Sequence, residues 1–292
     1  MKFVYDWKDI LTLPQAEGTC WLLANGLGGY ASTSAAFSVT RNDQGLLVAA
    51  DTPSQRFNLV HRLSETLSGE DGSVFLSSQT FDGERQAEDG WRRLTSFTWE
   101  DGPCWQYQAG GVRAVRRFGM EHGANAAAVV YTVENRSDAP CTLRVTPVLQ
   151  FSPKGEARQS QISLRCDGGK IQGEGLTLCV KSSAGLSDVP QDCEALFYED
   201  DRKDGRREKG LGLICTAAEL TVPQGEDGRL ELVFSTEISD KTGAEILRDS
   251  EARQRALLED SGFKDPVARE LARSADHFIA YRPSTGGKTI LA

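Results

Sequence analysis

Residues Ala127–Leu149 read AAVVYTVENRSDAPCTLRVTPVL, and this stretch decides the fold class. Two runs rich in Val, Thr and Leu, at Ala127–Val133 and Thr142–Leu149, flank the polar segment Glu134–Pro140. β-Branched residues favour strands, whereas Asn, Ser, Asp and Pro favour turns. Apolar and polar residues alternate along the second run, as they do in a strand with one face in a core. The stretch therefore predicts two antiparallel strands joined by a turn.

The same pattern continues on both sides of this stretch and predicts a mainly β fold. Turn residues separate the runs at intervals of roughly 8–15 residues, which is typical of a large antiparallel sandwich of two stacked sheets. The further runs are Gly45–Ala50, Ser73–Leu76, Trp91–Trp99, Val112–Phe118, Gln161–Cys166, Leu176–Val180, Leu211–Cys215 and Arg229–Phe234. The charged stretch Glu199–Gly210 mixes both signs and is interpreted as the exposed tip of a hairpin.

The composition changes after about Ile238 and becomes typical of helices. Ala244–Leu258 is rich in Ala, Glu, Arg and Leu, with apolar residues near helical spacing. Asp265 and Pro266 predict the start of a second helix, because Asp caps helices and Pro suits the first helical position. One face of that helix would carry Val267, Leu271, Ala275, Phe278 and Ile279. We expect a β domain at 1–237 and a helical linker at 238–292.

Charge and composition exclude several classes of function. The net charge is −9, which disfavours nucleic acid as a partner because phosphate binding needs a basic face. No apolar run approaches the ~18 residues of a membrane span, and the N-terminus carries acids without an apolar leader. We therefore expect a cytoplasmic protein without membrane contact. The seven cysteines are scattered and the chain has three histidines, so we expect no metal site and no cofactor.

The segment Asn25–Ser32, NGLGGYAS, is the most unusual local stretch. Its glycines permit positive φ and a close approach by another chain or a ligand. It departs from the dinucleotide-binding fingerprint at Ala31 and lacks a βαβ context. A tight structural turn and a ligand-binding loop both remain open. The half P-loop Gly286–Thr289 lacks the required glycine at Arg282 and is rejected.

Other candidate residues carry weaker signals. His122 lies between two strand-like runs, where a histidine is either a structural hydrogen-bonding group or a functional one. Aromatic side chains stack on sugars but are also ordinary core residues, and both readings stay open here. The clustered aromatic residues are Trp91, Phe97, Trp99, Trp105 and Tyr107. Carboxylates are too numerous for any pair to be nominated for glycoside hydrolysis.

Four ordered segments together resemble the N-terminal region of bacterial and archaeal glycogen debranching enzymes, the amylo-α-1,6-glucosidases. The first, Trp21–Ser32, is similar to the family signature W-L-x-x-N-G-L-G-G-Y-A-S. The other segments are Thr40-Arg41 with Gly45–Ala49, Gly110-Gly111 with Met120–Asn125, and Ala275–Ile279 with Lys288–Ala292. This chain departs from the family pattern at Asn42-Asp43-Gln44, where relatives read R-Y-H. It departs again at Phe151–Glu156, where relatives carry an R-D-x-H-like stretch.

The resemblance implies a β-supersandwich followed by an (α/α)₆ catalytic barrel that would begin after Ala292. The parent enzyme would hydrolyse α-1,6 branch linkages, and this chain alone would hold no catalytic residue. The expected partners are an α-glucan, either glycogen or a maltooligosaccharide, and the missing catalytic domain. The candidate substrate-binding residues are Asn25, Gly26, Gly28, Gly29, Tyr30, Arg41, Trp105 and His122. A stand-alone carbohydrate-binding module and a purely structural docking domain are the alternatives, and an independent enzyme ranks last.

Overall fold

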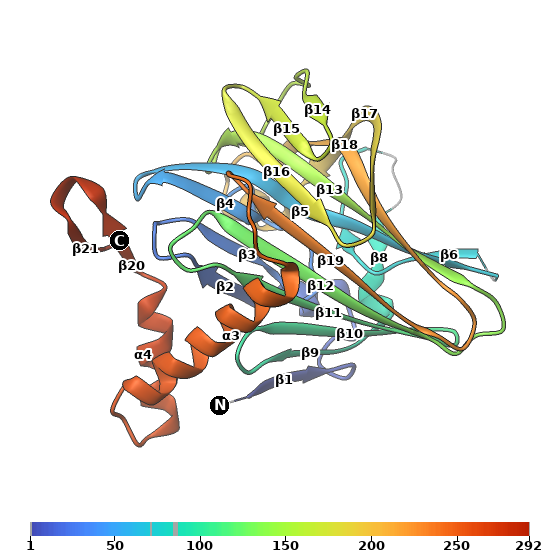
Figure 1. Cartoon of the computed structure of the whole chain (residues 1–292), viewed down its shortest axis with the longest axis horizontal. Coiled ribbons are helices and arrows are strands. Elements are labelled where there is room, and N and C mark those ends of the chain that lie inside the picture. The colour runs from blue at the N-terminus through green and yellow to red at the C-terminus, as the bar shows by residue number, and fades with distance from the viewer. Residues whose placement is uncertain (1, 71, 84–86, 292) are drawn as a thin grey trace.

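The computed structural model describes residues 2–70, 72–83 and 87–291, and within them two large antiparallel sheets dominate (Figure 1). The nine-stranded sheet has the order β1 (Phe3–Asp6), β9 (Leu94–Trp99), β10 (Pro103–Ala109), β11 (Val112–Met120), β12 (Ala126–Asn135), β19 (Asp227–Ser235), β16 (Leu176–Ser182), β15 (Lys170–Gly173) and β14 (Arg165–Asp167). The mainly β class with a helical region near the C-terminus is confirmed.

The second sheet has eight strands among the described residues. Its order is β17 (Gly185–Phe197), β18 (Lys209–Val222), β13 (Cys141–Pro153), β5 (Gln55–Gly69), β4 (Gly45–Thr52), β3 (Tyr30–Ser34) and β2 (Cys20–Ala24), with β6 (Gly72–Phe75) paired to β5. The short strands β7 (Ser78–Gln79) and β8 (Glu88–Asp89) pair separately. The predicted turn at 134–140 is confirmed, because β12 ends at Asn135 and β13 begins at Cys141.

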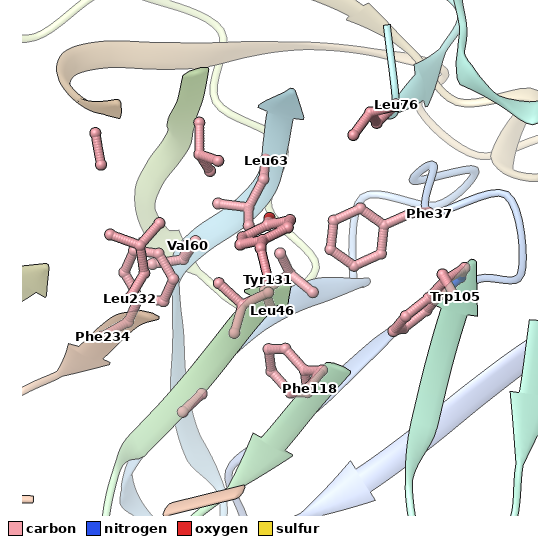
Figure 2. Close-up of a cluster of buried hydrophobic side chains, with 14 of the residues drawn as sticks. Phe37, Leu46, Val60, Leu63, Leu76, Trp105, Phe118, Tyr131, Leu232 and Phe234 are labelled. Atoms are coloured by element: carbon pink, nitrogen blue, oxygen red, sulfur yellow. The ribbon is translucent and has the colours of Figure 1, made fainter. Parts of the chain in front are cut away.

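The core lies between the two sheets and is built from alternating positions of their strands. Along β11, inward-facing Val112, Ala114 and Phe118 are buried, while Arg113, Val115 and Arg117 are more exposed. Figure 2 shows Phe118 with Tyr131 of β12 among the other labelled core side chains. Burying one large apolar side chain, such as that of Phe118, contributes about 1.5–3 kcal/mol to folding stability. The alternating pattern therefore favours a fold in which these positions face each other between two sheets.

Two arginines occupy core positions within this alternation. Arg116 of β11 donates hydrogen bonds to Glu65 and to the Tyr107 hydroxyl. Arg62 of β5 pairs with both Glu88 and Glu194, and its side chain is fully buried. Buried charges are tolerated where such partners are present.

Four helices and two short 3₁₀ segments complete the elements of the described residues. They are α1 (Leu13–Glu17), η1 (Gly90–Arg92), α2 (Glu199–Lys203), α3 (Gly243–Asp260), α4 (Pro266–Asp276) and η2 (Pro283–Thr285). The predicted start of α4 is confirmed: Asp265 caps it by accepting the Ala268 amide at 2.9 Å, and Pro266 follows. Helix α3 packs on β11, β12 and β19. Ile246 of α3 joins Ala128 and Val233 in a small cluster there.

Two expectations about the connections are corrected. The charged stretch near 199–210 is not simply an exposed tip, because α2 forms there and buried Asp201 accepts the Asn42 amide at 2.7 Å. The region after α4 is not helical throughout, because β20 (Ile279–Arg282) and β21 (Gly287–Ile290) form a hairpin. Gly286 closes that hairpin at φ 65°, where a residue with a side chain is disfavoured.

Candidate functional site

The glycine-rich loop Asn25–Gly29 joins β2 to β3, and the buried side chain of Asn25 holds its shape. The Oδ1 atom accepts a hydrogen bond from the Leu27 amide at 2.9 Å. The Nδ2 group donates to the Ala124 carbonyl at 3.0 Å and to Asn125 Oδ1 at 2.9 Å. These bonds satisfy a buried amide that would otherwise be costly. They also join the loop to the β11–β12 turn at residues 121–125.

Each glycine of the loop meets a neighbour that leaves no room for a side chain. A β-carbon at Gly26 (φ 75°) would lie 2.2 Å from His122 Cε1, and one at Gly28 (φ 101°) would lie 2.7 Å from Pro53 Cα. A β-carbon at Gly29 would lie 2.8 Å from a backbone oxygen of β4. Packing therefore accounts for the glycines at positions 28 and 29. Gly26 differs from these two glycines, because the atoms nearest to its β-carbon position belong to the exposed side chain of His122.

His122 is exposed in the β11–β12 turn and lies among charged groups of the C-terminal region. Partial burial lowers its pKa, and the positive charges of Arg253 and Lys288 lower it further, against the opposing effect of Asp276. Arg253 Nη2 donates to both carboxylate oxygens of Asp276, at 2.8 and 2.7 Å. The imidazole is therefore neutral at neutral pH and can both donate and accept one hydrogen bond.

The C-terminal hairpin contacts the glycine-rich loop directly. The Tyr281 amide of β20 donates to the Gly26 carbonyl at 2.8 Å, and the Gly123 amide donates to the Asn25 carbonyl at 2.7 Å. Figure 1 shows β20 and β21 at the same end of the molecule as the connection between β2 and β3. We call this region the loop surface and define it as Gly26, Leu27, His122, Gly123 and Tyr281.

Tyr30 and Arg41 lie toward a different part of the chain. The Tyr30 hydroxyl donates to the Asp43 carbonyl, and burial raises the pKa of this phenol. Arg41 pairs with Asp204 and lies 3.9 Å from Asp201, both near α2. The structure thus brings Asn25, Gly26 and His122 close together. Arg41 belongs to a separate acidic neighbourhood.

Trp105 does not offer a sugar-stacking face, and this expectation is corrected. Its side chain is 0% exposed, and its Nε1 donates to the Ala35 carbonyl at 2.8 Å. The ring centroid lies 5.1 Å from that of Phe37, with the Arg116 guanidinium 4.5 Å from the indole. Figure 2 shows Trp105 close to Phe37 in the core. The alternative reading as a core aromatic residue is therefore the correct one.

The two stretches that depart from the family pattern lie next to each other. Lys154 is paired with Asp43 at 3.7 Å, which joins residues 151–156 to residues 42–44. Both stretches line one polar hollow of about 580 Å³, to which Arg158 and Arg207 also contribute. Gln44 is buried, and its Oε1 accepts the Thr40 amide at 2.7 Å. In this chain Gln44 therefore supports the turn and is not presented to solvent.

One residue of the loop surface and two charged residues near it were not predicted. Tyr281 of the loop surface, and Arg253 and Asp276 near His122, are distant in sequence from the glycine-rich loop, and the fold brings them close to it. Asn125 lies in the quoted segment Met120–Asn125 but was not singled out. Its two side-chain bonds to the Ala50 backbone, at 2.9 and 2.8 Å, explain an asparagine at this position.

Within the described residues, no group of three His, Cys, Asp or Glu side chains is arranged to hold a metal ion. None of the helices in that same part of the chain has the length and apolar character to cross a membrane.

The family model for the N-terminal region of glycogen debranching enzymes matches residues 19–228, more than half of the chain. The chain belongs to this family. No curated protein gives a significant match to the sequence.

Among solved structures, the chain is similar to a protein assigned as a kojibiose phosphorylase from the human microbiome, with 12% identity and a TM-score of 0.42. That likeness covers 95% of this chain and 37% of the other. A bacterial glucoamylase complexed with acarbose gives 11% identity and a TM-score of 0.38, covering 94% of this chain and 37% of that one. This debranching-type N-terminal domain thus spans little more than a third of the length of these solved chains.

Proposed function

We propose that this domain forms one wall of a glucan-binding cleft and assists hydrolysis of α-1,6 branch linkages by a separate catalytic domain. The observation that carries the proposal is the loop surface. There the glycine-rich loop and the C-terminal hairpin share a backbone hydrogen bond between Gly26 and Tyr281. In this proposal the chain segment that leads to a catalytic domain lies beside the loop that faces the glucan.

The chemistry of the loop surface is compatible with a neutral polyhydroxylated ligand. His122 is exposed and neutral, so it offers one donor and one acceptor to sugar hydroxyls. The Tyr281 side chain is 44% exposed, and an aromatic ring has an apolar face that suits a pyranose. The proposal assigns no catalytic residue to this chain, because the hydrolytic carboxylates would come from the catalytic domain.

The outer face of α4 supports docking of that catalytic domain. Val267 and Leu271 of α4 are 55% and 66% exposed, whereas Glu270 and Arg273 of the same helix are buried. Phe278, two residues after the helix ends, is 53% exposed. An apolar face turned outward is typical of a surface that another protein part covers. The same observation favours the second candidate function, a purely structural docking domain without sugar affinity.

A cytoplasmic location stays a prediction.

The third candidate, a stand-alone carbohydrate-binding module, needs exposed aromatic residues. Trp105, Tyr107 and Phe97 of the predicted aromatic cluster are buried in the core. Only Trp91 and Trp99 of this cluster are partly exposed, so this candidate has less support than the other two.

Glucan binding by the 292-residue chain tests the proposal. Maltohexaose and branched glycogen are titrated calorimetrically into the wild type, His122→Ala and the control Lys170→Ala, whose position is exposed on β15. We expect binding that weakens about tenfold in His122→Ala, equivalent to ~1.4 kcal/mol, and stays unchanged in the control. Absence of binding at millimolar sugar would contradict the proposal and favour the structural docking domain.

A further inference from the structure

A cysteine of the edge strand β14 points into the space between the two sheets. Cys166 lies opposite Ile171 of β15, which is fully buried. Residues paired across two antiparallel strands point to the same face, so the Cys166 side chain also faces the core. Its neighbours Arg165 and Asp167 are exposed, as the alternation along a strand requires. Cys166 itself is partly exposed and packs against the main core cluster.

A second cysteine reaches the same space from the other sheet. Cys215 of β18 is buried and belongs to the core cluster between the sheets. The thiols of Cys215 and Cys166 share a hydrogen bond. This contact joins the edge of the nine-stranded sheet to the eight-stranded sheet, and Figure 1 shows β14 beside β17 and β18.

A pair of hydrogen bonds fixes the chain just before β14. The Gln191 side chain of β17 accepts the Leu164 amide at 3.1 Å and donates to the Leu164 carbonyl. Leu164 is buried and precedes Cys166 by two residues. Strand β17 runs next to β18, with Asp192 opposite Ile214. These bonds therefore hold Cys166 beside the part of β18 that carries Cys215.

The pair differs from an ordinary buried cysteine, which is inert. Cys166 is partly exposed, so a small oxidant can reach its sulfur. Burial and the contact with Cys166 raise the pKa of the Cys215 thiol, so Cys215 stays protonated and oxidation starts at Cys166. A sulfenic acid condenses readily with a neighbouring thiol, and Cys215 is that neighbour.

We propose that Cys166 and Cys215 are a modification site, at which hydrogen peroxide forms a reversible disulfide bond between the two sheets. The Cys166 thiolate attacks one peroxide oxygen, the O–O bond breaks, and the departing hydroxide takes up a proton to become water. The Cys215 sulfur then attacks the sulfenic sulfur of Cys166, the S–O bond breaks, and the Cys215 proton leaves with hydroxide as the second water. Two thiols and one peroxide thus give one disulfide and two waters, and the two electrons lost by sulfur reduce the peroxide.

The disulfide would act on a weakly held part of the fold. Strand β14 spans only Arg165–Asp167 and lies at the end of its sheet, paired with β15. Short edge elements open locally at a low free-energy cost, and a covalent bond to β18 opposes that opening. The inference is independent of the proposed function, because it involves neither a glucan nor the loop surface.

The test treats the reduced, folded full-length chain with hydrogen peroxide, blocks the remaining thiols by alkylation, and maps disulfide-linked peptides by mass spectrometry. Cys166→Ser and Cys215→Ala each remove one partner. Cys179→Ser is the matched control, because Cys179 is also partly exposed on a strand of the nine-stranded sheet and lies outside the pair. Thermal melting before oxidation confirms that each variant is folded.

We expect a Cys166–Cys215 linked peptide in the wild type and in Cys179→Ser, lost in both pair variants and reversed by dithiothreitol through thiol–disulfide exchange. Amide hydrogen exchange at residues 165–173 should slow by about tenfold or more in the oxidised chain. Two free thiols after peroxide, or sulfinic acid at Cys166 without a disulfide, would overturn the inference. A link from either cysteine to Cys193, which packs against the same core cluster, would also overturn it.

Discussion

Replacement of Gly28 by Ala tests whether the glycine-rich loop is held by close packing. The residue has φ 101°, and a β-carbon would lie 2.7 Å from Pro53 Cα and 3.1 Å from the Pro53 carbonyl oxygen. The positive φ costs a residue with a side chain about 1–2 kcal/mol. Overlap with a backbone that cannot rotate away adds about 1–3 kcal/mol. We therefore expect Gly28→Ala to lose ~2–5 kcal/mol of unfolding free energy.

Gly123 supplies the matched control for this substitution. It also has a positive φ, of 83°, but a β-carbon there would meet nothing within 4 Å. Gly123→Ala should therefore lose only the conformational part, about 1–2 kcal/mol. Urea unfolding followed by tryptophan fluorescence measures both free energies, and melting temperatures should fall by about 2–4 °C per kcal/mol. If Gly28→Ala is no less stable than Gly123→Ala, the reasoning about close approach to Pro53 is refuted.

Three further predictions concern stability and the surface. Arg62→Met removes the charge between the buried carboxylates Glu88 and Glu194 and should cost about 3–5 kcal/mol in urea unfolding; a loss below about 1 kcal/mol would contradict this. Burial raises the pKa of Glu17 from 4.5 to about 7. Between these two pH values the folded chain binds more protons than the unfolded chain, so the contribution of this carboxyl to stability falls as pH rises. The advantage of Glu17→Gln over the wild type should therefore grow across the window, and equal pH slopes in urea titrations would count against it. Leu271→Glu should reduce binding of the dye anilinonaphthalene sulfonate, which reports exposed apolar surface, because this side chain is 66% exposed. Stability should change by less than about 0.5 kcal/mol, and unchanged dye binding would count against the docking face.

The strands and the helix start could be predicted because their signals are local. The alternation at Thr142–Leu149 and the polar segment before it led to β13 and its turn. Asp265 and Pro266 predicted the start of α4 for a reason that the structure reproduces, a side-chain cap followed by a residue without an amide hydrogen.

The elements that could not be predicted depend on distant partners. Arg116 stands in a strand pattern where a charged residue indicates solvent, yet it faces the core because Glu65 and Tyr107 reach it there. The β20–β21 hairpin is short, and the Tyr281 amide is paired with a loop more than 250 residues earlier in the chain. The sequence around Arg116 and around Tyr281 gives no sign of these long-range contacts.

The candidate site was predictable in part for the same reason. Gly26 and His122 were singled out from their own segments, and the fold brings them together. Trp105 could not be assigned correctly, because core and sugar-stacking aromatic residues look alike in a strand until burial is known.

Hydrogen exchange with and without maltohexaose tests the central claim, that the loop surface faces a glucan. The account predicts slower exchange at the Leu27 amide and in residues 122–124 when the sugar is present, with no change at Lys170 on β15. Unchanged exchange throughout the loop surface at saturating sugar would contradict the account and leave the domain with a docking role alone.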